Sequence, residues 1–203
     1  MGRVRLASPH LLRQTILMSD KADLSAQPAR GTNFVSAVPD GDNRTRQVCA
    51  DCGFINYENP KIVVGAVCHW GDRILMCRRA INPRKGHWTL PAGFLELHET
   101  TTAGAAREAW EEARARIEIE TLLAVYAVPR ISQVQLMYRA RLTTDDISAG
   151  PESLEVGLFE WDRIPWDDIA FPSVRWALHQ FKESRHLDSF AAFTNPPGET
   201  GDF

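Results

Sequence analysis

Hydrophobic and polar residues follow two different periods along this chain. Short β-branched or alternating runs at residues 62–70 and 73–79 flank a Gly-Asp pair, which is typical of a β-hairpin. Residues 117–128, 134–142 and 158–161 read as further strands. Helical periodicity follows Thr100 and Ser173, each of which we expect to cap a helix. The pattern therefore predicts strands interleaved with two helices.

The first of these helices is expected to carry a concentrated negative charge. Glu108, Glu111 and Glu112 are spaced i, i+3, i+4 and so point the same way. Like charges at that spacing destabilise a helix, and Arg107 is the one nearby cation in the sequence. One interpretation is a solvated acidic face. The other is a site for a hard divalent cation such as Mg²⁺, which prefers carboxylate oxygens.

The two ends of the chain lack such periodicity. Residues 1–19 contain three Arg and no acid, which suggests a disordered extension, an upstream start codon or a transit peptide. Residues 20–46 are polar and read as loop or linker, and residues 195–203 as a loose tail. We predict an extension at 1–32, an accessory element at 33–60, a catalytic domain at 61–185 and a C-terminal tail at 186–203.

Composition narrows the class of protein. The chain has 203 residues, 44% of them hydrophobic, which is enough for one packed catalytic domain and a small addition. A net charge of −3 gives no electrostatic reason to expect a nucleic-acid or membrane partner. The four cysteines do not form the pattern of a disulfide framework, so a cytoplasmic location is expected.

Two of the cysteines, Cys49 and Cys52, form a C-x-x-C-G turn. Such a turn offers two thiolates, whereas tetrahedral zinc takes four ligands. Residues 1–48 contain no further Cys, so Zn²⁺ is not expected here. The alternative is a β-turn without metal.

The stretch from Gly93 to Ala115 resembles the Nudix box, G-x5-E-x7-R-E-U-x-E-E-x-G-U, where U is aliphatic. Six matches at fixed spacings have a chance probability on the order of 10⁻⁵. Two departures affect glycines: Arg114 replaces the box Gly, and His98 precedes the first box Glu where relatives often have Gly. The matching residues are Gly93, Glu99, Arg107, Glu108, Glu111 and Glu112.

The flanking runs extend this resemblance over residues 36–183, to the zinc-ribbon-bearing Nudix enzymes that cleave FAD, ADP-ribose or NADH. The resemblance implies an α/β fold, a Nudix αβα sandwich with a mixed β-sheet, preceded by a degenerate zinc-ribbon-like element. The Ser-Gln-Pro-Trp-Pro-Phe-Pro tract of the NADH enzymes is absent, which favours FAD or ADP-ribose, with release of AMP. NADH or an ADP-sugar is the alternative substrate. Relatives are commonly homodimers, so a homodimer is expected.

The resemblance also assigns roles to residues. Glu108, Glu111, Glu112 and the Gly93 carbonyl are expected to bind Mg²⁺, for which Mn²⁺ can substitute, while Glu99 and Arg107 pair. The catalytic candidates are Arg107, Glu111, Glu112 and Glu155, and the general base is left open between the box glutamates and Glu155. The substrate-binding candidates are Trp88, Phe94, Arg78 and Tyr138, with core packing as the alternative for the three aromatics.

Two other classes of function remain open. A Nudix module that senses a nucleotide without cleaving it usually lacks some box acids, and all are present here. A zinc-ribbon interaction protein with a metal-free Nudix core would contain stoichiometric zinc and show no hydrolysis.

Overall fold

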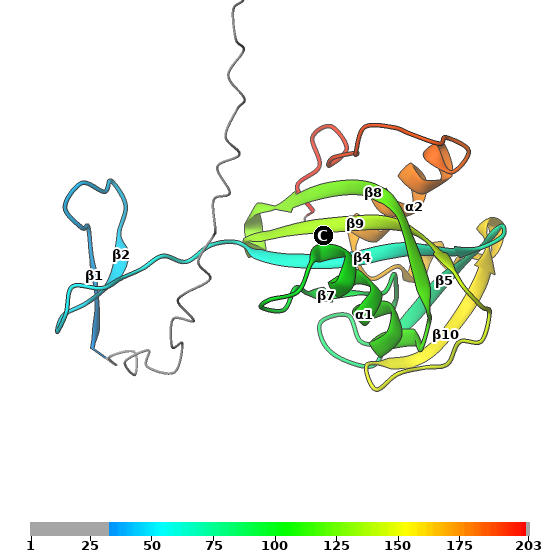
Figure 1. The fold of residues 1–203 in the computed structure, drawn as a ribbon, viewed down its shortest axis with the longest axis horizontal. Coiled ribbons are helices and arrows are strands. Elements are labelled where there is room, and N and C mark those ends of the chain that lie inside the picture. Colours follow the sequence, from blue (N-terminus) through cyan, green and yellow to red (C-terminus); the bar gives the residue numbers. More distant parts are fainter. Residues whose placement is uncertain (1–32, 202–203) are drawn as a thin grey trace, which may run out of the picture. The chain divides into compact units, whose positions relative to one another are not determined.

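A computed structural model describes residues 33–201 of the chain, which divides into two compact units at Tyr57 and Glu58 (Figure 1). The large unit carries the box and a seven-stranded sheet, and the small unit a three-stranded sheet. Within the described residues, no helix is long and apolar enough to span a bilayer.

The small unit is an antiparallel sheet of β1 (Phe34–Ala37), β2 (Arg46–Cys49) and β3 (Ile55–Asn56), in that order. The C-x-x-C-G turn joins β2 to β3. The Cys49 amide donates to the Phe54 carbonyl at 2.8 Å, and the Gly53 amide donates to the Cys49 carbonyl at 2.8 Å. Gly53 has a positive φ of 74°, which glycine adopts without steric cost.

The sheet of the large unit is mixed, because β4 and β9 run parallel while its other strand pairs are antiparallel. The strand order is β10-β5-β4-β9-β8, with β6 beside β5 and β7 beside β4. The strands are β4 (Lys61–Trp70), β5 (Arg73–Arg79), β6 (Trp88–Thr89), β7 (Ala92–Phe94), β8 (Ile117–Val128), β9 (Gln133–Leu142) and β10 (Ser153–Glu160).

Two helices cover opposite faces of this sheet, α1 (Thr101–Ala113) and α2 (Pro172–Ser184) (Figure 1). Alternate residues along β9 belong to different cores, as the period of a strand requires: Met137 joins the core under α2, and Tyr138 the core under α1. The predicted α/β fold with a mixed sheet is confirmed. Single turns of 3₁₀ helix complete the fold at η1 (Pro129–Ile131), η2 (Trp161–Arg163) and η3 (Trp166–Asp168).

The structure confirms one of the two predicted helix caps and contradicts the other. Thr100 caps α1, and its Oγ1 accepts a hydrogen bond from the Ala103 amide at 3.2 Å. The prediction for Ser173 was wrong: α2 begins two residues earlier, with Phe171 as N-cap and Pro172 in the first turn. Proline suits that position because its fixed φ is helical and its missing N–H has no partner there.

The segment after α2, expected to be loose, lies against β8. The Phe193 amide donates to the Leu123 carbonyl, and the Val125 amide donates to the Phe193 carbonyl, each at 2.9 Å. The side chain of Asn195 then hydrogen-bonds both the amide and the carbonyl of Ala127, at 2.9 and 2.8 Å. These bonds attach the segment to the sheet as a short strand would.

Candidate active site

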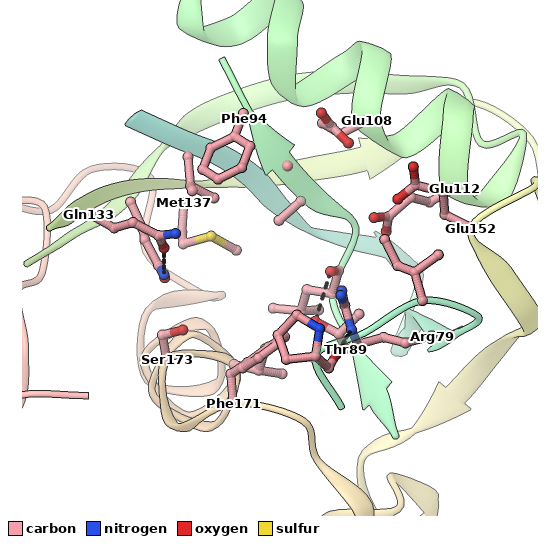
Figure 2. A pocket seen from close by; sticks show the side chains of 18 of the residues that line it. Arg79, Thr89, Phe94, Glu108, Glu112, Gln133, Met137, Glu152, Phe171 and Ser173 are labelled. Atoms are coloured by element: carbon pink, nitrogen blue, oxygen red, sulfur yellow. Dashed lines mark hydrogen bonds between the residues drawn. The ribbon is translucent and has the colours of Figure 1, made fainter. Parts of the chain in front are cut away.

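The box helix borders a cavity of about 980 Å³ in the large unit (Figure 2). One part of its wall is acidic, formed by Glu108, Glu111 and Glu112 of α1 and by Glu152. Other parts come from β7, β9 and the start of α2. The cavity has the volume of an ordinary small-molecule site.

Gly93 allows α1 to approach β7 closely. It pairs with Val64 of β4, and an added Cβ would lie 2.4 Å from Glu108 Oε1. Any larger residue would therefore displace the Glu108 carboxylate. The glycine of the box is needed here for space, not for an unusual φ.

Arg107 holds the loop before α1 against the helix. Its Nη2 and Nε donate to the two oxygens of Glu99 at 2.8 and 3.1 Å, and Nη2 also donates to the Phe94 carbonyl at 3.0 Å. Its Nη1 donates to Glu108 Oε1 at 2.7 Å and to Glu111 Oε2 at 2.9 Å. The hydrogen bond from Arg107, followed by that from the Glu96 amide, lowers the pKa of Glu99. The structure thus brings together the residues expected to pair and relieves part of the acidic repulsion.

Glu112 is the acid that is least compensated. It is 6% exposed, and its Oε2 is buried without a hydrogen-bond partner in the part of the chain described. Burial, followed by the nearby charge of Glu108, raises the pKa of Glu112 to about 8. Burial also raises the pKa of Glu108, although Arg107 opposes the shift. Both groups would be stabilised by a cation in the cavity.

Another acid of the cavity is Glu152, which we did not single out from the sequence. Its loop packs tightly on the end of α1: the Gly150 amide donates to the Glu112 carbonyl at 2.9 Å, and a Cβ at Gly150 would lie 1.7 Å from the Glu111 carbonyl oxygen. Figure 2 shows the Glu152 carboxylate beside that of Glu112.

Glu155, the candidate named from the sequence, lies elsewhere. Its carboxylate is 3.6 Å from Arg78 Nη1, its side chain is 57% exposed, and it does not line the cavity. A register shift between Ser153 and Glu155 lies at the start of β10. Such an irregularity changes which side chains face the site, and the sequence alone does not reveal it.

Of the four substrate-binding candidates, one lines the cavity. Phe94 lines the cavity with its ring half-exposed. Trp88 is buried against Phe159 at 4.9 Å between ring centroids. Tyr138 is buried, with its hydroxyl 2.6 Å from Thr101 Oγ1, and neither buried aromatic lines the cavity. The Nε of Arg78 donates to the Gly86 carbonyl at 2.8 Å, outside the cavity.

Comparison with known proteins identifies the family. The NUDIX domain model matches residues 59–182, and a second model, described as Nudix N-terminal, matches residues 30–58. The chain belongs to the NUDIX family. The predicted family membership is confirmed, including its ribbon-bearing branch.

Nudix relatives of known sequence include a MutT-like protein of Streptomyces ambofaciens, 43% identical over 79 residues, which are 39% of this chain and 49% of that protein. An ADP-ribose pyrophosphatase of Methanocaldococcus jannaschii is 28% identical over 113 residues, 54% of this chain and 67% of that protein. The chain thus spans about half the length of the first relative and two thirds of the second.

A crystal structure of a NUDIX hydrolase from Nitrosomonas europaea is similar along most of its length. It superimposes with a TM-score of 0.75 at 47% identity, covering 79% of this chain and 93% of that one.

Both departures from the box keep a backbone conformation that suits glycine. His98 and Arg114 take the left-handed conformation usual for glycine, with φ of 68° and 52°.

The chemistry of the acidic wall fits a divalent metal ion. Glu108, Glu111 and Glu112 offer hard oxygen ligands, and the unpartnered oxygen of Glu112 lacks the positive partner that a buried carboxylate needs. As they stand, no three His, Cys, Asp or Glu side chains of residues 33–201 converge into a metal centre, because Glu108 and Glu111 turn toward Arg107. Metal binding would have to draw these carboxylates away from the guanidinium.

The small unit contains two free cysteines, Cys49 and Cys52. Cys49 is buried and Cys52 exposed. Hydrogen bonds from the amides of Asp51 and Cys52 lower the pKa of the Cys49 thiol. By contrast, burial raises the pKa of Cys68, in the large unit, to about 12. That zinc is not bound here stays a prediction.

Two amide side chains of the cavity wall were also missed in the sequence. Gln133 and Gln135 lie on β9, at alternate positions with Met137, and line the cavity. The available signal was an amide at two successive inward positions of a strand, where apolar residues are the rule.

Proposed function

We propose that this chain is a Mg²⁺-dependent Nudix diphosphatase that cleaves an AMP-linked diphosphate, with ADP-ribose or FAD as the favoured substrates. The observation that carries this proposal is one cavity with four carboxylates in part of its wall and an aromatic ring and two amides in another. Nudix hydrolases generally use divalent metals such as Mg²⁺ or Mn²⁺. The Methanocaldococcus relative, named an ADP-ribose pyrophosphatase, supports the substrate class.

The reaction adds water across a P–O–P linkage. One water oxygen bonds to a phosphorus, the bridging oxygen leaves with the other phosphoryl group, and two phosphate monoesters result. The anionic oxygens of the diphosphate repel the nucleophile, so the enzyme must neutralise charge and orient the water. A metal ion held by Glu108, Glu111 and Glu112 would supply charge neutralisation and a more acidic water.

Side chains of this protein would position the loop, add positive charge near the substrate and accept the proton of the attacking water. Arg107 fixes the loop that follows β7, next to the Gly93 carbonyl, through Glu99 and the Phe94 carbonyl. Arg79 lines the cavity and adds positive charge near the substrate, with its guanidinium 5.1 Å from the ring centroid of Phe171. Proton acceptance from the attacking water is assigned to Glu152 or to Glu112 Oε2, since both carboxylates face the cavity.

An assay of FAD, ADP-ribose, NADH and ADP-sugars with Mg²⁺ tests the proposal. The wild-type protein should release AMP, and Glu112→Gln should lower kcat by at least 100-fold, because the neutral amide is a poor ligand for a hard cation. Glu118→Gln is the matched control: Glu118 pairs with Arg141 on the exposed surface of β8 and β9, so turnover should not change. Full turnover by the Glu112→Gln protein would refute the metal assignment. Tight nucleotide binding without any product would indicate a sensing module instead.

A further inference from the structure

Gln133 and Gln135 form a hydrogen-bonded pair of amides on the cavity wall. Residues two apart on a strand share a face, and β4 places Val63 next to Gln135 on that same face. Gln135 Nε2 donates to Gln133 Oε1 at 3.3 Å. Figure 2 shows Gln133 and Met137 grouped with Phe94, and Glu112 and Glu152 grouped away from them.

The bond between the two amides uses the amino group of Gln135 and the carbonyl group of Gln133. Gln133 Nε2 and Gln135 Oε1 make no hydrogen bond to the part of the chain that the structure describes. A flip of both amides would exchange their roles, but one amino group and one carbonyl group would still remain for a ligand. The pair is therefore complementary to a ligand edge that carries an acceptor beside a donor.

The surroundings of the amide pair suit a flat ring. Val63 and Met137 provide apolar surface, and Phe94 offers a half-exposed aromatic face at the same part of the cavity. Lys61 Nζ lies 5.2 Å from the centroid of the Phe94 ring. An exposed aromatic side chain beside amide groups is suited to hold a nucleobase by stacking and by hydrogen bonds to its edge.

We propose that Gln133 and Gln135 bind the adenine base of the substrate, with Phe94 stacking on the ring. Adenine presents an amino donor beside a ring-nitrogen acceptor, the pattern that glutamine amides bind through two hydrogen bonds. On the edge that adenine forms with its N6 amino group and N7, guanine and hypoxanthine carry a carbonyl oxygen in place of the amino group and so present two acceptors. This inference rests on the proposed function, because it puts the base at the amides and the diphosphate at the carboxylates.

Binding of AMP, IMP and GMP, measured calorimetrically without metal, tests this assignment independently of hydrolysis. The wild-type protein should bind AMP about tenfold more tightly than IMP or GMP. Gln135→Met should reduce this ratio to below threefold. Gln135→Glu keeps an acceptor for the adenine amino group and should retain most of the preference. Phe94→Ala should weaken AMP and IMP equally, because stacking does not distinguish the two bases.

Steady-state kinetics with ADP-ribose then separates the two proposals. Gln135→Met should raise KM by about tenfold and change kcat by less than threefold. Equal binding of AMP and IMP to the wild-type protein, or an unchanged preference in Gln135→Met, would overturn the adenine assignment even if ADP-ribose is hydrolysed. A clear AMP preference without hydrolysis would keep the assignment and refute the diphosphatase.

Discussion

Two residues of the Nudix box region show how a sequence tolerates the loss of a glycine. His98 and Arg114 both have positive φ, a conformation that costs an L-residue roughly 1 kcal/mol or more. At Arg114 the helix end is kept by hydrogen bonds from the Arg114 amide to Trp110 and from the Ala115 amide to Ala109. The backbone at both positions therefore keeps a conformation that suits glycine, and the Cβ of the side chain makes that conformation strained.

Replacing these residues by glycine should stabilise the protein. We expect Arg114→Gly and His98→Gly each to raise the free energy of unfolding by about 0.5–1 kcal/mol in urea denaturation. For Arg114 the gain is limited, since its guanidinium also lies 5.6 Å from the centroid of the Trp110 ring. Ala103→Gly, on an exposed helical position of α1, is the control and should instead destabilise by about 0.5–1 kcal/mol. If both His98→Gly and Arg114→Gly destabilised the protein, backbone strain at these two positions would be refuted.

Glu112 predicts how the stability of the metal-free protein depends on pH. Its pKa is about 8 in the folded state against an ordinary 4.5, so the folded state holds the proton more tightly than the unfolded state. Stability should therefore be highest with Glu112 protonated, fall as pH rises above about 4.5, and level off above about 8. The loss attributable to Glu112 should be on the order of 5 kcal/mol, because its pKa is about 8 in the folded state and 4.5 ordinarily.

Thermal unfolding in EDTA between pH 5 and pH 9 checks this dependence. Glu112→Gln should flatten the curve and melt at a higher temperature than the wild-type protein at pH 9, while Glu118→Gln should follow the wild-type curve. Added Mg²⁺ should raise the melting temperature of the wild-type protein at pH 9 more than that of Glu112→Gln. Parallel curves for wild type and Glu112→Gln would show that burial of this carboxylate has no energetic cost.

At the scale of elements, the loop between β7 and α1 depends on a single guanidinium. Arg107 makes two bonds to Glu99, one to the Phe94 carbonyl and one each to Glu108 and Glu111, whereas an ammonium group has only three donors. Arg107→Lys should destabilise the protein by about 2 kcal/mol and lower kcat, because the loop between β7 and the acids of α1 loses its bonds to the helix.

Chemical denaturation and proteolysis of residues 95–100 measure this effect. The control is Arg141→Lys in the exposed pair with Glu118, where the change should be below about 0.5 kcal/mol. Faster cleavage of the loop in Arg107→Lys alone is expected. Equal losses of stability in the two variants would indicate that Arg107 is no more than a surface partner.

At the scale of the whole large unit, the C-terminal segment completes both the sheet and the cavity. Asn195 also donates to the Glu199 carbonyl at 3.0 Å, and Gly201 lines the cavity, where an added Cβ would lie 3.0 Å from Val128. The segment is thus attached to β8 at Phe193 and Asn195 and reaches the site beyond them.

Asn195→Ala should detach this part of the chain. We expect a loss of about 1–2 kcal/mol in the free energy of unfolding and faster hydrogen exchange of the Ala127 amide. KM should rise while kcat changes less, because the cavity wall is altered away from the carboxylates. Thr194→Ala, at the preceding exposed residue, is the control. Unchanged exchange at Ala127 in Asn195→Ala would refute the role of this side chain.

The residues of the box and the order of strands and helices were determined by the sequence itself. The spacing of Glu108, Glu111 and Glu112 is local, and a helix places these acids on a common face whatever surrounds it. Strand periodicity likewise predicted β4, β5, β8 and β9 near their observed positions.

The rest of the site was decided by tertiary structure. The register shift at the start of β10 and the packing of Gly150 on α1 place Glu152, not Glu155, beside Glu112. Trp88 and Tyr138 became core, and Gln133 and Gln135 became cavity wall, through strand pairings between segments distant in sequence. Local spacing specifies which side chains share a face of one element, but only the packing of several elements decides what that face meets.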